Sequence, residues 1–308
     1  MRRTIVGALC VLLLVAAAPS QAQQEGSPIP TGVDLLPGVT NWEGTSGFDP
    51  NSTDDCLAGR EECVDAVIRK MTRHVEPLAS SCDHNVIFAL TYLRTTENYK
   101  ATLFWDPPLF RDRARVNHFD EIFASYYFAA WKSWQVQNGK TPPAWRIHFQ
   151  AADDHATSGR ANVIAGTIAH IQNDLPQVLY ETGLVDDQGV SRKDDHDAAN
   201  KFLYEGTPAI FAELSRRFDP TVDDSDQPGE LDNALSFETI VAWREQAWRD
   251  AERLALAPND AARALIVRDI EARAAANVAA AVGSGAYPPG SGGAAARDAY
   301  CAEHWDDV

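Results

Sequence analysis

The chain has 308 residues, 45% of which are hydrophobic, and carries a formal net charge of −17 at pH 7. This length and apolar content allow a sizeable core without a partner chain, and the excess of carboxylates repels phosphates and anionic lipid head groups at long range. The composition therefore argues against a basic nucleic-acid groove.

Residues 1–22 have the pattern of a secretory signal peptide. Arg2 and Arg3 precede an uncharged apolar stretch, and the small residues Ser20 and Ala22 suit signal peptidase. The apolar run of about 15 residues is shorter than the roughly 20 that span a bilayer. We therefore predict cleavage after Ala22, a mature chain of 286 residues with net charge −19, a secreted or extracytoplasmic location and no transmembrane anchor.

Four cysteines, Cys56, Cys63, Cys82 and Cys301, remain after this cleavage. An even number of cysteines in an oxidising compartment favours two disulfides, which can be connected in three ways. The preferred pairing joins Cys56 to Cys63 as a local link and Cys82 to Cys301, which ties the C-terminal tail to the body. The alternative is a zinc site, although the sequence contains no Cys-x-x-Cys pair.

Residues 23–55 are rich in Pro, Gly, Ser and Thr, which predicts an extended arm lying on the body. After this arm, apolar residues recur at helical spacing. The predicted helices run through Val64–Val75 and Val86–Leu93, from Pro107 to about Asn138, from about Pro142 to Ala156, from about Ser158 to Gly183 with an interruption at Pro176, and over 193–218, 235–256 and 259–282.

No stretch alternates apolar and polar residues with β-branched enrichment, so almost no sheet is expected. Neither a solenoid repeat nor a linker divides the body. Residues 283–308 begin with a Gly- and Pro-rich stretch, which predicts a flexible tail tethered by Cys301. We predict an all-α fold, with a single bundle-like domain over 56–282 between the N-terminal arm and this tail.

His170 and Asp174 lie four residues apart on one predicted helix and therefore share a face. The flanking residues Ile168, Ile171 and Leu175 are apolar, which places the pair against the interior. A buried imidazole beside a buried carboxylate needs a partner, and a divalent cation would satisfy both. In the structural alternative, Asp174 caps a helix that begins at Leu175, and His170 is a core histidine with a hydrogen-bonded neighbour.

Two Asp-Asp-His tripeptides, residues 153–155 and 194–196, flank this segment. Carboxylates and imidazoles are ligands of divalent metals, but Asp pairs are also frequent at helix N-termini, where they oppose the helix dipole. For each tripeptide the capping or surface interpretation is preferred.

His118 and Asp120 form a further pair on the long aromatic helix, and helical bundles often build metal sites from such inward-facing side chains. The predicted catalytic residues are His170 and Asp174. The predicted metal ligands are the same two residues together with His118, Asp120, and one of His155 or His196.

Several nucleophile and phosphate motifs are missing from the sequence. It has no G-x-S-x-G, no Gly-rich phosphate loop and no H-E-x-x-H. These absences weigh against a serine hydrolase, a P-loop NTPase and a zincin.

The stretch Gly166–Pro176 (GTIAHIQNDLP), together with His118–Tyr127 (HFDEIFASYY), resembles a helical family of unknown function. This resemblance covers roughly residues 60–215 and implies no activity.

A more distant likeness is to the zinc-dependent phospholipase C and single-strand nuclease group, which are all-helical secreted phosphodiesterases with clustered zinc ions. Its members carry an H-x-x-x-D helix followed by Gln-Pro, and here His170 and Asp174 precede the reversed order, Pro176-Gln177. The likeness implies that His170 and Asp174 ligate zinc and that a bridging water attacks a phosphodiester. The chain departs from the group because its predicted mature start is Gln23 instead of tryptophan, and because it has no second H-x-x-x-E/D helix.

Together these features predict a secreted metal-dependent hydrolase that acts on phosphodiester or ester bonds of a small-molecule or lipid-like substrate. Its cofactor is expected to be a divalent metal, with zinc as the candidate, and the oligomeric state stays open. The alternative is a non-catalytic exported binding protein whose helical core encloses a small apolar ligand, lined by Phe123, Tyr126, Tyr127, Trp131 and Trp134. A third reading is a metal-free enzyme that uses His170 and Asp174 as a proton-transfer pair.

Overall fold

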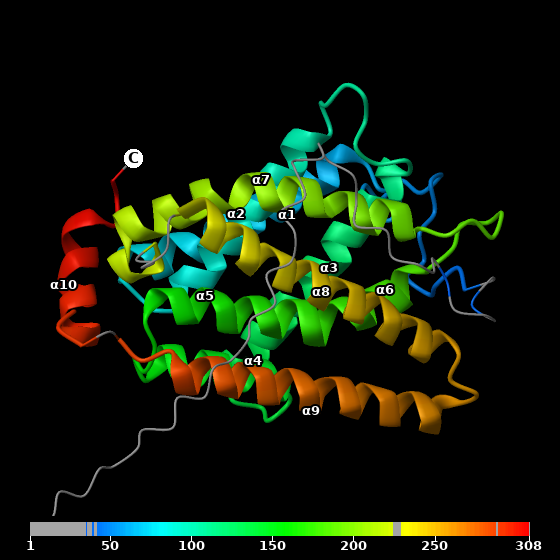
Figure 1. The fold of residues 1–308 in the computed structure, drawn as a ribbon. Helices are drawn as coiled ribbons and strands as arrows, with labels where there is room; N and C mark the ends of the chain where they lie inside the picture. The colour runs from blue at the N-terminus through cyan, green and yellow to red at the C-terminus, as the bar shows by residue number, and fades with distance from the viewer. Residues whose placement is uncertain (1–34, 36–38, 40–41, 224–228, 288, 308) are drawn as a thin grey trace, which may run out of the picture. The chain divides into compact units, whose positions relative to one another are not determined.

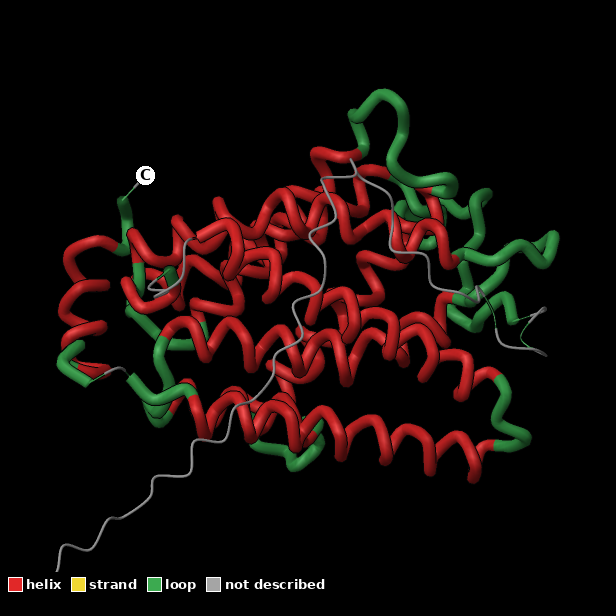
Figure 2. The backbone as a smooth tube through the Cα atoms, in the orientation of Figure 1, coloured by secondary structure: helices red, strands yellow, loops and turns green. Residues whose placement is uncertain are grey.

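The computed structural model describes residues 35, 39, 42–223, 229–287 and 289–307. The predicted signal peptide and most of the predicted arm before residue 42 lie outside these residues. Figure 2 shows helices joined by loops, and the described part of the chain contains no strand beyond an isolated bridge between Val185 and Ser191. The prediction of an all-α fold is confirmed. Among the described residues, no helix combines the length and the apolar character needed to cross a membrane.

The helices follow one another with short connections (Figure 1). In chain order they are α1 (Glu61–Ser80), α2 (Val86–Thr102), α3 (Arg113–Gln135), α4 (Pro143–Asp153), α5 (Gly159–Ile168), the π-helix η1 (Ala169–Asp174), α6 (Leu175–Thr182), α7 (Lys193–Arg217), the 3-10 helix η2 (Pro220–Val222), α8 (Gly229–Ala255), α9 (Asp260–Ser284) and α10 (Gly293–His304).

The start of α3 differs from the sequence prediction. The helix begins at Arg113 because the carboxylate of Asp112 accepts a hydrogen bond from the backbone N–H of Arg115 at 3.1 Å, which caps the first turn. Residues 103–112 form turns and bends, so the predicted start at Pro107 is several residues too early.

Aromatic side chains of α2, α3 and α4 meet in the core. Phe88 of α2 packs edge-on against Tyr127 of α3 and Trp145 of α4, with ring centroids 5.5 and 5.3 Å apart. Trp145 also stacks on Phe149 one turn later in α4. All four side chains are buried. Burial of such large apolar surfaces is the main stabilising contribution to this part of the bundle.

The connection between α5 and α6 lies in the interior of the bundle. The π-helix η1 packs against α3, α4, α8 and α9 as well as against its two flanking helices. Side chains from η1 are therefore surrounded by protein on several sides.

The described end of the N-terminal arm, residues 42–55, lies on the helical body, as predicted. Trp42 stacks on Tyr180 of α6 with ring centroids 4.6 Å apart, and its indole N–H donates to the carbonyl of Tyr180 at 2.6 Å. The backbone N–H groups of Thr45 and Ser46 donate to the carbonyl of Glu181. This arm therefore covers the end of α6.

Both predicted disulfides are present. Cys56 pairs with Cys63, and Cys82 pairs with Cys301 across a separation of 219 residues. The alternative of a cysteine zinc site is wrong because all four thiols are oxidised.

The C-terminal segment differs from the predicted flexible tail. Residues after the Gly- and Pro-rich stretch form α10, which lies across one end of the other helices (Figure 1). The disulfide at Cys301 holds α10 to the loop after α1, and the hydroxyl of Tyr300 donates to the carbonyl of Arg216 at 2.9 Å. The prediction of a flexible tail was wrong because it extended the character of the Gly- and Pro-rich stretch to the residues after it, which form a helix.

Candidate functional site

The segment that carries His170 and Asp174 widens into a π-turn. α5 ends at Ile168, η1 contains both residues, and α6 begins at Leu175. Pro176 lacks an N–H and its ring would clash with the preceding turn of a regular helix, so the wider turn directly before it accommodates the proline. The helix is therefore irregular over Ala169–Asp174, just before Pro176, where the sequence predicted the interruption. Single π-turns are rare and often occur at functional sites.

The side chains of His170 and Asp174 contact each other. Nδ1 of His170 lies 2.9 Å from Oδ2 of Asp174, and both residues are buried. The same oxygen accepts a hydrogen bond from the indole N–H of Trp145 at 2.9 Å. Oδ1 of Asp174 accepts from the side-chain amide of Asn173 at 2.8 Å. This carboxylate makes no capping hydrogen bond to α6, so the capping role in the structural alternative is wrong. The other part of that alternative, a buried histidine with a hydrogen-bonded neighbour, agrees with the structure.

The hydrogen bond to Asp174 sets the tautomer of His170. A carboxylate accepts but does not donate, so Nδ1 of the imidazole carries the proton and Nε2 presents a lone pair. Burial lowers the pKa of His170, although the hydrogen bond and the charge of Asp174 act in the opposite direction. Nε2 is buried and has no hydrogen-bond partner. The pair is thus a neutral imidazole, oriented by a carboxylate, whose second nitrogen is a free acceptor.

Aromatic rings hold the imidazole in place. His170 stacks on Phe123 of α3 with ring centroids 3.6 Å apart and an interplanar angle of 7°. Tyr92 of α2 lies on it at 4.4 Å with a tilt of 59°. These contacts fix the ring plane, so Nε2 has a defined direction.

Two adjoining apolar cavities lie beside His170. Their volumes are about 130 and 140 Å³, and they share six lining residues, namely Tyr92, Thr95, Phe123, Phe202, Leu203 and Arg244. His170 lines the second cavity, and Asp120 lines the first. An apolar cavity of about 150 Å³ can hold benzene, so each of these has room for a molecule of roughly one ring.

Two further polar groups at these cavities lack partners. The hydroxyl of Tyr92 and Oδ2 of Asp120 are both buried without a hydrogen bond. Burial, and secondarily the charge of Glu121, raises the pKa of Asp120 to about 7. Burial, followed by the charges of Asp120 and Asp174, raises the pKa of Tyr92 well above its usual value. Unsatisfied buried polar groups are rare in folded proteins, and three of them line these two adjoining cavities: His170 the second, Asp120 the first, and Tyr92 both.

The six predicted metal ligands are not brought together. His118 bonds the carbonyl of Cys56 and the hydroxyl of Ser46, both at 2.8 Å. Nε2 of His196 lies 3.2 Å from the carbonyl of Arg244. Both histidines therefore tie segments of the chain together, away from the contacts of His170.

The Asp-Asp-His tripeptides occupy different kinds of position. Asp194 and Asp195 are in the first turn of α7, where their charge opposes the helix dipole, but neither makes a side-chain capping hydrogen bond to this helix. The carboxylate of Asp195 instead accepts from the backbone N–H groups of Arg111 and Asp112. Residues 153–155 instead lie at the C-terminal end of α4, whose last residue is Asp153, and Asp153 accepts hydrogen bonds from Asn85 and Trp134. An N-terminal capping role for this tripeptide is therefore wrong, while the predicted surface position is confirmed because all three residues are exposed.

His155 is part of a possible metal-binding cluster. Among the described residues, this is the one group of three or more His, Cys, Asp or Glu side chains whose ligand atoms lie close enough to share an ion. The group consists of His84, His155 and Asp298, whose ligand atoms all lie within 4.8 Å of one another. The other five predicted ligands are not part of it. Sequence reasoning missed His84 and Asp298, yet the predicted Cys82–Cys301 disulfide already placed their neighbourhoods together.

Tyr92 and Trp145 were also missed as site residues. Each contacts the His170–Asp174 pair from a separate helix, and only the packing of α2 and α4 against η1 reveals this. In the sequence they are ordinary apolar-face residues.

Comparison with known proteins places the chain in a family. A model described as "Family of unknown function (DUF5995)" matches residues 64–282. The chain belongs to this family. No curated protein and no solved structure matches it. The DUF5995 match includes His170, Asp174 and every residue that lines the two cavities, whereas Asp298 lies beyond it.

Proposed function

We propose that this chain binds a small, mostly apolar molecule that carries a hydroxyl group, in the two cavities beside His170. The observation that carries this proposal is the buried Nε2 of His170, which has no partner although the opposite nitrogen is held by Asp174. An unpaired buried acceptor costs about 1–3 kcal/mol, and a ligand that donates a hydrogen bond would recover it.

The walls of the cavities define the rest of the ligand. Phe123, Phe202 and Leu203 line both spaces, so the body of the ligand is expected to be apolar. The ligand's hydroxyl would donate to Nε2 of His170 and could accept from the unpaired hydroxyl of Tyr92. A single-ring alcohol or phenol fits one cavity, and a longer molecule would span both.

The contacts of Asp174 favour this reading over a cation shared with His170. Both carboxylate oxygens already accept hydrogen bonds, from Trp145, His170 and Asn173. A cation between His170 and Asp174 would have to displace these donors. The metal-dependent hydrolase and the likeness to zinc phospholipases therefore stay predictions, as does secretion.

Calorimetric titration with phenol and with toluene tests the binding. In the wild type, the hydrogen bond to Nε2 favours phenol. The variant His170→Phe keeps a ring on Phe123 but has no acceptor, so the ratio of phenol affinity to toluene affinity is expected to fall about tenfold. An unchanged ratio would refute the role of His170.

A second pair of variants tests the location. Thr95 lines both cavities, and its hydroxyl bonds the carbonyl of Thr91. Thr95→Phe should fill the space and abolish binding of both probes. Thr72 makes the same type of bond to Ile68 but lines neither cavity, so Thr72→Phe is the matched control and should bind normally. Equal effects of the two variants would place the ligand elsewhere.

A second candidate function, acid–base catalysis, is favoured by the orientation of His170 by Asp174. An imidazole held in this way can remove a proton from water or from a hydroxyl group through Nε2. Phenyl acetate is a suitable substrate because its ring fits one cavity. His170→Phe should then lower kcat/KM for its hydrolysis by about a hundredfold or more. If the wild type hydrolyses it no faster than the variant, the site binds without catalysing.

A further inference from the structure

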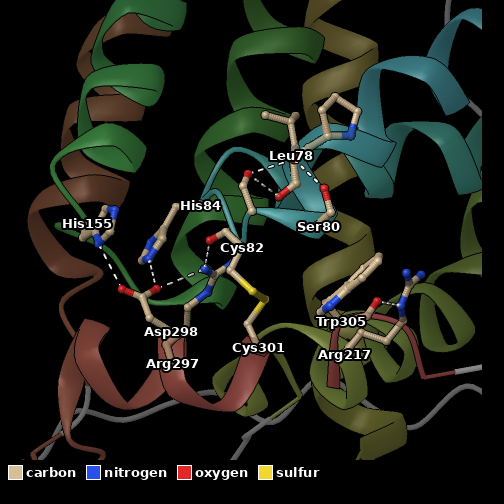
Figure 3. The surroundings of a disulfide bond; sticks show 12 residues. Leu78, Ser80, Cys82, His84, His155, Arg217, Arg297, Asp298, Cys301 and Trp305 are labelled. Carbon is tan, nitrogen blue, oxygen red and sulfur yellow. Dashed lines mark hydrogen bonds and ion pairs between the residues drawn. A yellow bond between two sulfur atoms is a disulfide. The ribbon is translucent and has the colours of Figure 1, made fainter. Parts of the chain in front are cut away.

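A second cluster of ionisable side chains lies near the Cys82–Cys301 disulfide. Its residues line neither of the two cavities of the proposed ligand site. Figure 3 shows the imidazoles of His84 and His155 side by side, both facing the carboxylate of Asp298. Nε2 of His84 lies 2.9 Å from Oδ1 of Asp298, and Nδ1 of His155 lies 3.4 Å from Oδ2. The two rings are stacked with centroids 3.9 Å apart.

Three separate segments supply these side chains. His84 belongs to the loop between α1 and α2, His155 follows α4 and Asp298 lies on α10. His84 comes two residues after Cys82, and Asp298 precedes Cys301 by three residues, about one helical turn. The disulfide therefore fixes the distance between the two ligands that come from opposite ends of the sequence.

The spacing of the ligand atoms suits a small divalent cation. With zinc–ligand distances of about 2.0–2.1 Å, the corners of a tetrahedron are about 3.3 Å apart. The distances of 2.9 and 3.4 Å run from the two histidine nitrogens to different oxygens of Asp298, and one ligand atom from each of the three residues lies within 4.8 Å of the other two. Small side-chain movements would bring all three atoms onto one ion.

The chemistry of the groups also fits a metal. Imidazole nitrogens and carboxylate oxygens are ligands that zinc binds. Because Nε2 of His84 faces the carboxylate of Asp298, the ring would move its proton to Nδ1 in order to present Nε2 to an ion. His155 is exposed, which leaves one side of the cluster open to solvent. Three protein ligands with one open position are typical of zinc sites that bind water or a substrate.

Arg297 limits the expected affinity. Its guanidinium donates to Oδ1 of Asp298 at 3.2 Å and also to the carbonyl of Cys82. These bonds orient the carboxylate, but the positive charge opposes a nearby cation. A dissociation constant for zinc in the micromolar range is therefore expected, weaker than that of a closed structural site.

We propose that His84, His155 and Asp298 bind one zinc-like divalent cation, at a site assembled by the Cys82–Cys301 disulfide. This inference goes beyond the proposed binding of an apolar molecule and does not depend on it. It also extends past the span of the family match, since Asp298 lies outside residues 64–282.

Titration of zinc chloride into chelator-treated, oxidised full chain tests the proposal. One zinc ion per chain is expected, and His155→Ala and Asp298→Asn should each weaken binding at least tenfold. His155 is exposed, so its variant should fold, which circular dichroism checks. The control is His304→Ala, which removes another histidine of α10 that has an Asp partner at 3.0 Å but no second histidine. It should leave zinc binding unchanged.

Two results would overturn the site. One is zinc binding that survives His155→Ala and Asp298→Asn, and the other is the absence of binding by the wild type. Loss of zinc binding in His170→Phe with no loss in His155→Ala would assign the metal to the sequence-predicted pair instead. For the role of the disulfide, the Cys82→Ser/Cys301→Ser double variant should bind zinc at least tenfold more weakly, and unchanged affinity there would refute it.

Discussion

The imidazole of His170 lies flat on the ring of Phe123, with ring centroids 3.6 Å apart. One residue is on the π-turn and the other is on α3, so this contact joins the irregular segment to a regular helix. Phe123 also lines both cavities. The same ring therefore supports the histidine and shapes the space beside it.

Removal of this ring should affect stability and binding together. Phe123→Ala deletes a half-buried aromatic side chain and enlarges the cavities, so the free energy of unfolding should fall by about 2–4 kcal/mol. Phenol affinity should fall as well because His170 loses its support. The control is Phe104→Ala, at a position where 69% of the residue surface is exposed, and it should change stability by no more than about 0.5 kcal/mol in urea unfolding.

Asp174 is expected to matter for both fold and chemistry. In Asp174→Asn one carboxylate oxygen becomes an NH₂ group, so at least one donor among Trp145, His170 and Asn173 loses its acceptor. A loss of about 1–3 kcal/mol in stability is expected. Because Asp174 raises the pKa of His170, the variant should lower that pKa further, which an NMR titration of the imidazole measures. An unchanged pKa of His170 in the variant would show that the two side chains do not contact each other in solution.

The buried carboxyl of Asp120 should make stability depend on pH. Its pKa is raised to about 7 in the folded chain, from 3.8 in the unfolded chain, so the folded state holds the extra proton between these values. The contribution of Asp120 to the free energy of unfolding is complete below pH 3.8 and is lost as pH rises toward 7, by about 4 kcal/mol at most. Asp120→Asn should remove this part of the decrease in the free energy of unfolding with rising pH. Parallel urea unfolding curves of wild type and variant from pH 4 to pH 8 test it, and an identical pH dependence would contradict it.

Two glycines in helices should respond in opposite ways to the same substitution. A Cβ on Gly166 of α5 would approach Cδ2 of Phe88 to 2.3 Å, whereas a Cβ on Gly283 of α9 would meet nothing within 4 Å. Gly166→Ala should lower the free energy of unfolding by about 1–3 kcal/mol through overpacking. Gly283→Ala should raise it by about 0.5–1 kcal/mol because alanine favours the helix. Thermal unfolding of both variants gives the signs, and the same sign for both would argue against close packing at Gly166.

Local patterns were sufficient to predict most of the fold. Apolar spacing located most of the helices, the even number of cysteines predicted two disulfides, and the preferred pairing among the three possible ones is confirmed. The closeness of His170 and Asp174 also followed from their separation of four residues, although they contact each other through a hydrogen bond and no cation is needed to explain it.

Non-local packing explains what the sequence did not reveal. Trp145 reaches Asp174 from 29 residues away, and no local pattern marks it as a partner. The cavities arise from gaps between packed helices, which have no counterpart in linear spacing. The grouping of His84, His155 and Asp298 likewise requires α10, a helix that the composition of the preceding linker concealed.

The bond between Cys82 and Cys301 closes a covalent ring that contains most of the helical body, since the two cysteines are 219 residues apart. A protease that cuts the backbone once within this ring leaves both fragments attached to each other. The cut chain would migrate as one species until a reducing agent is added. A single cleavage thus nicks the molecule without releasing a piece of it.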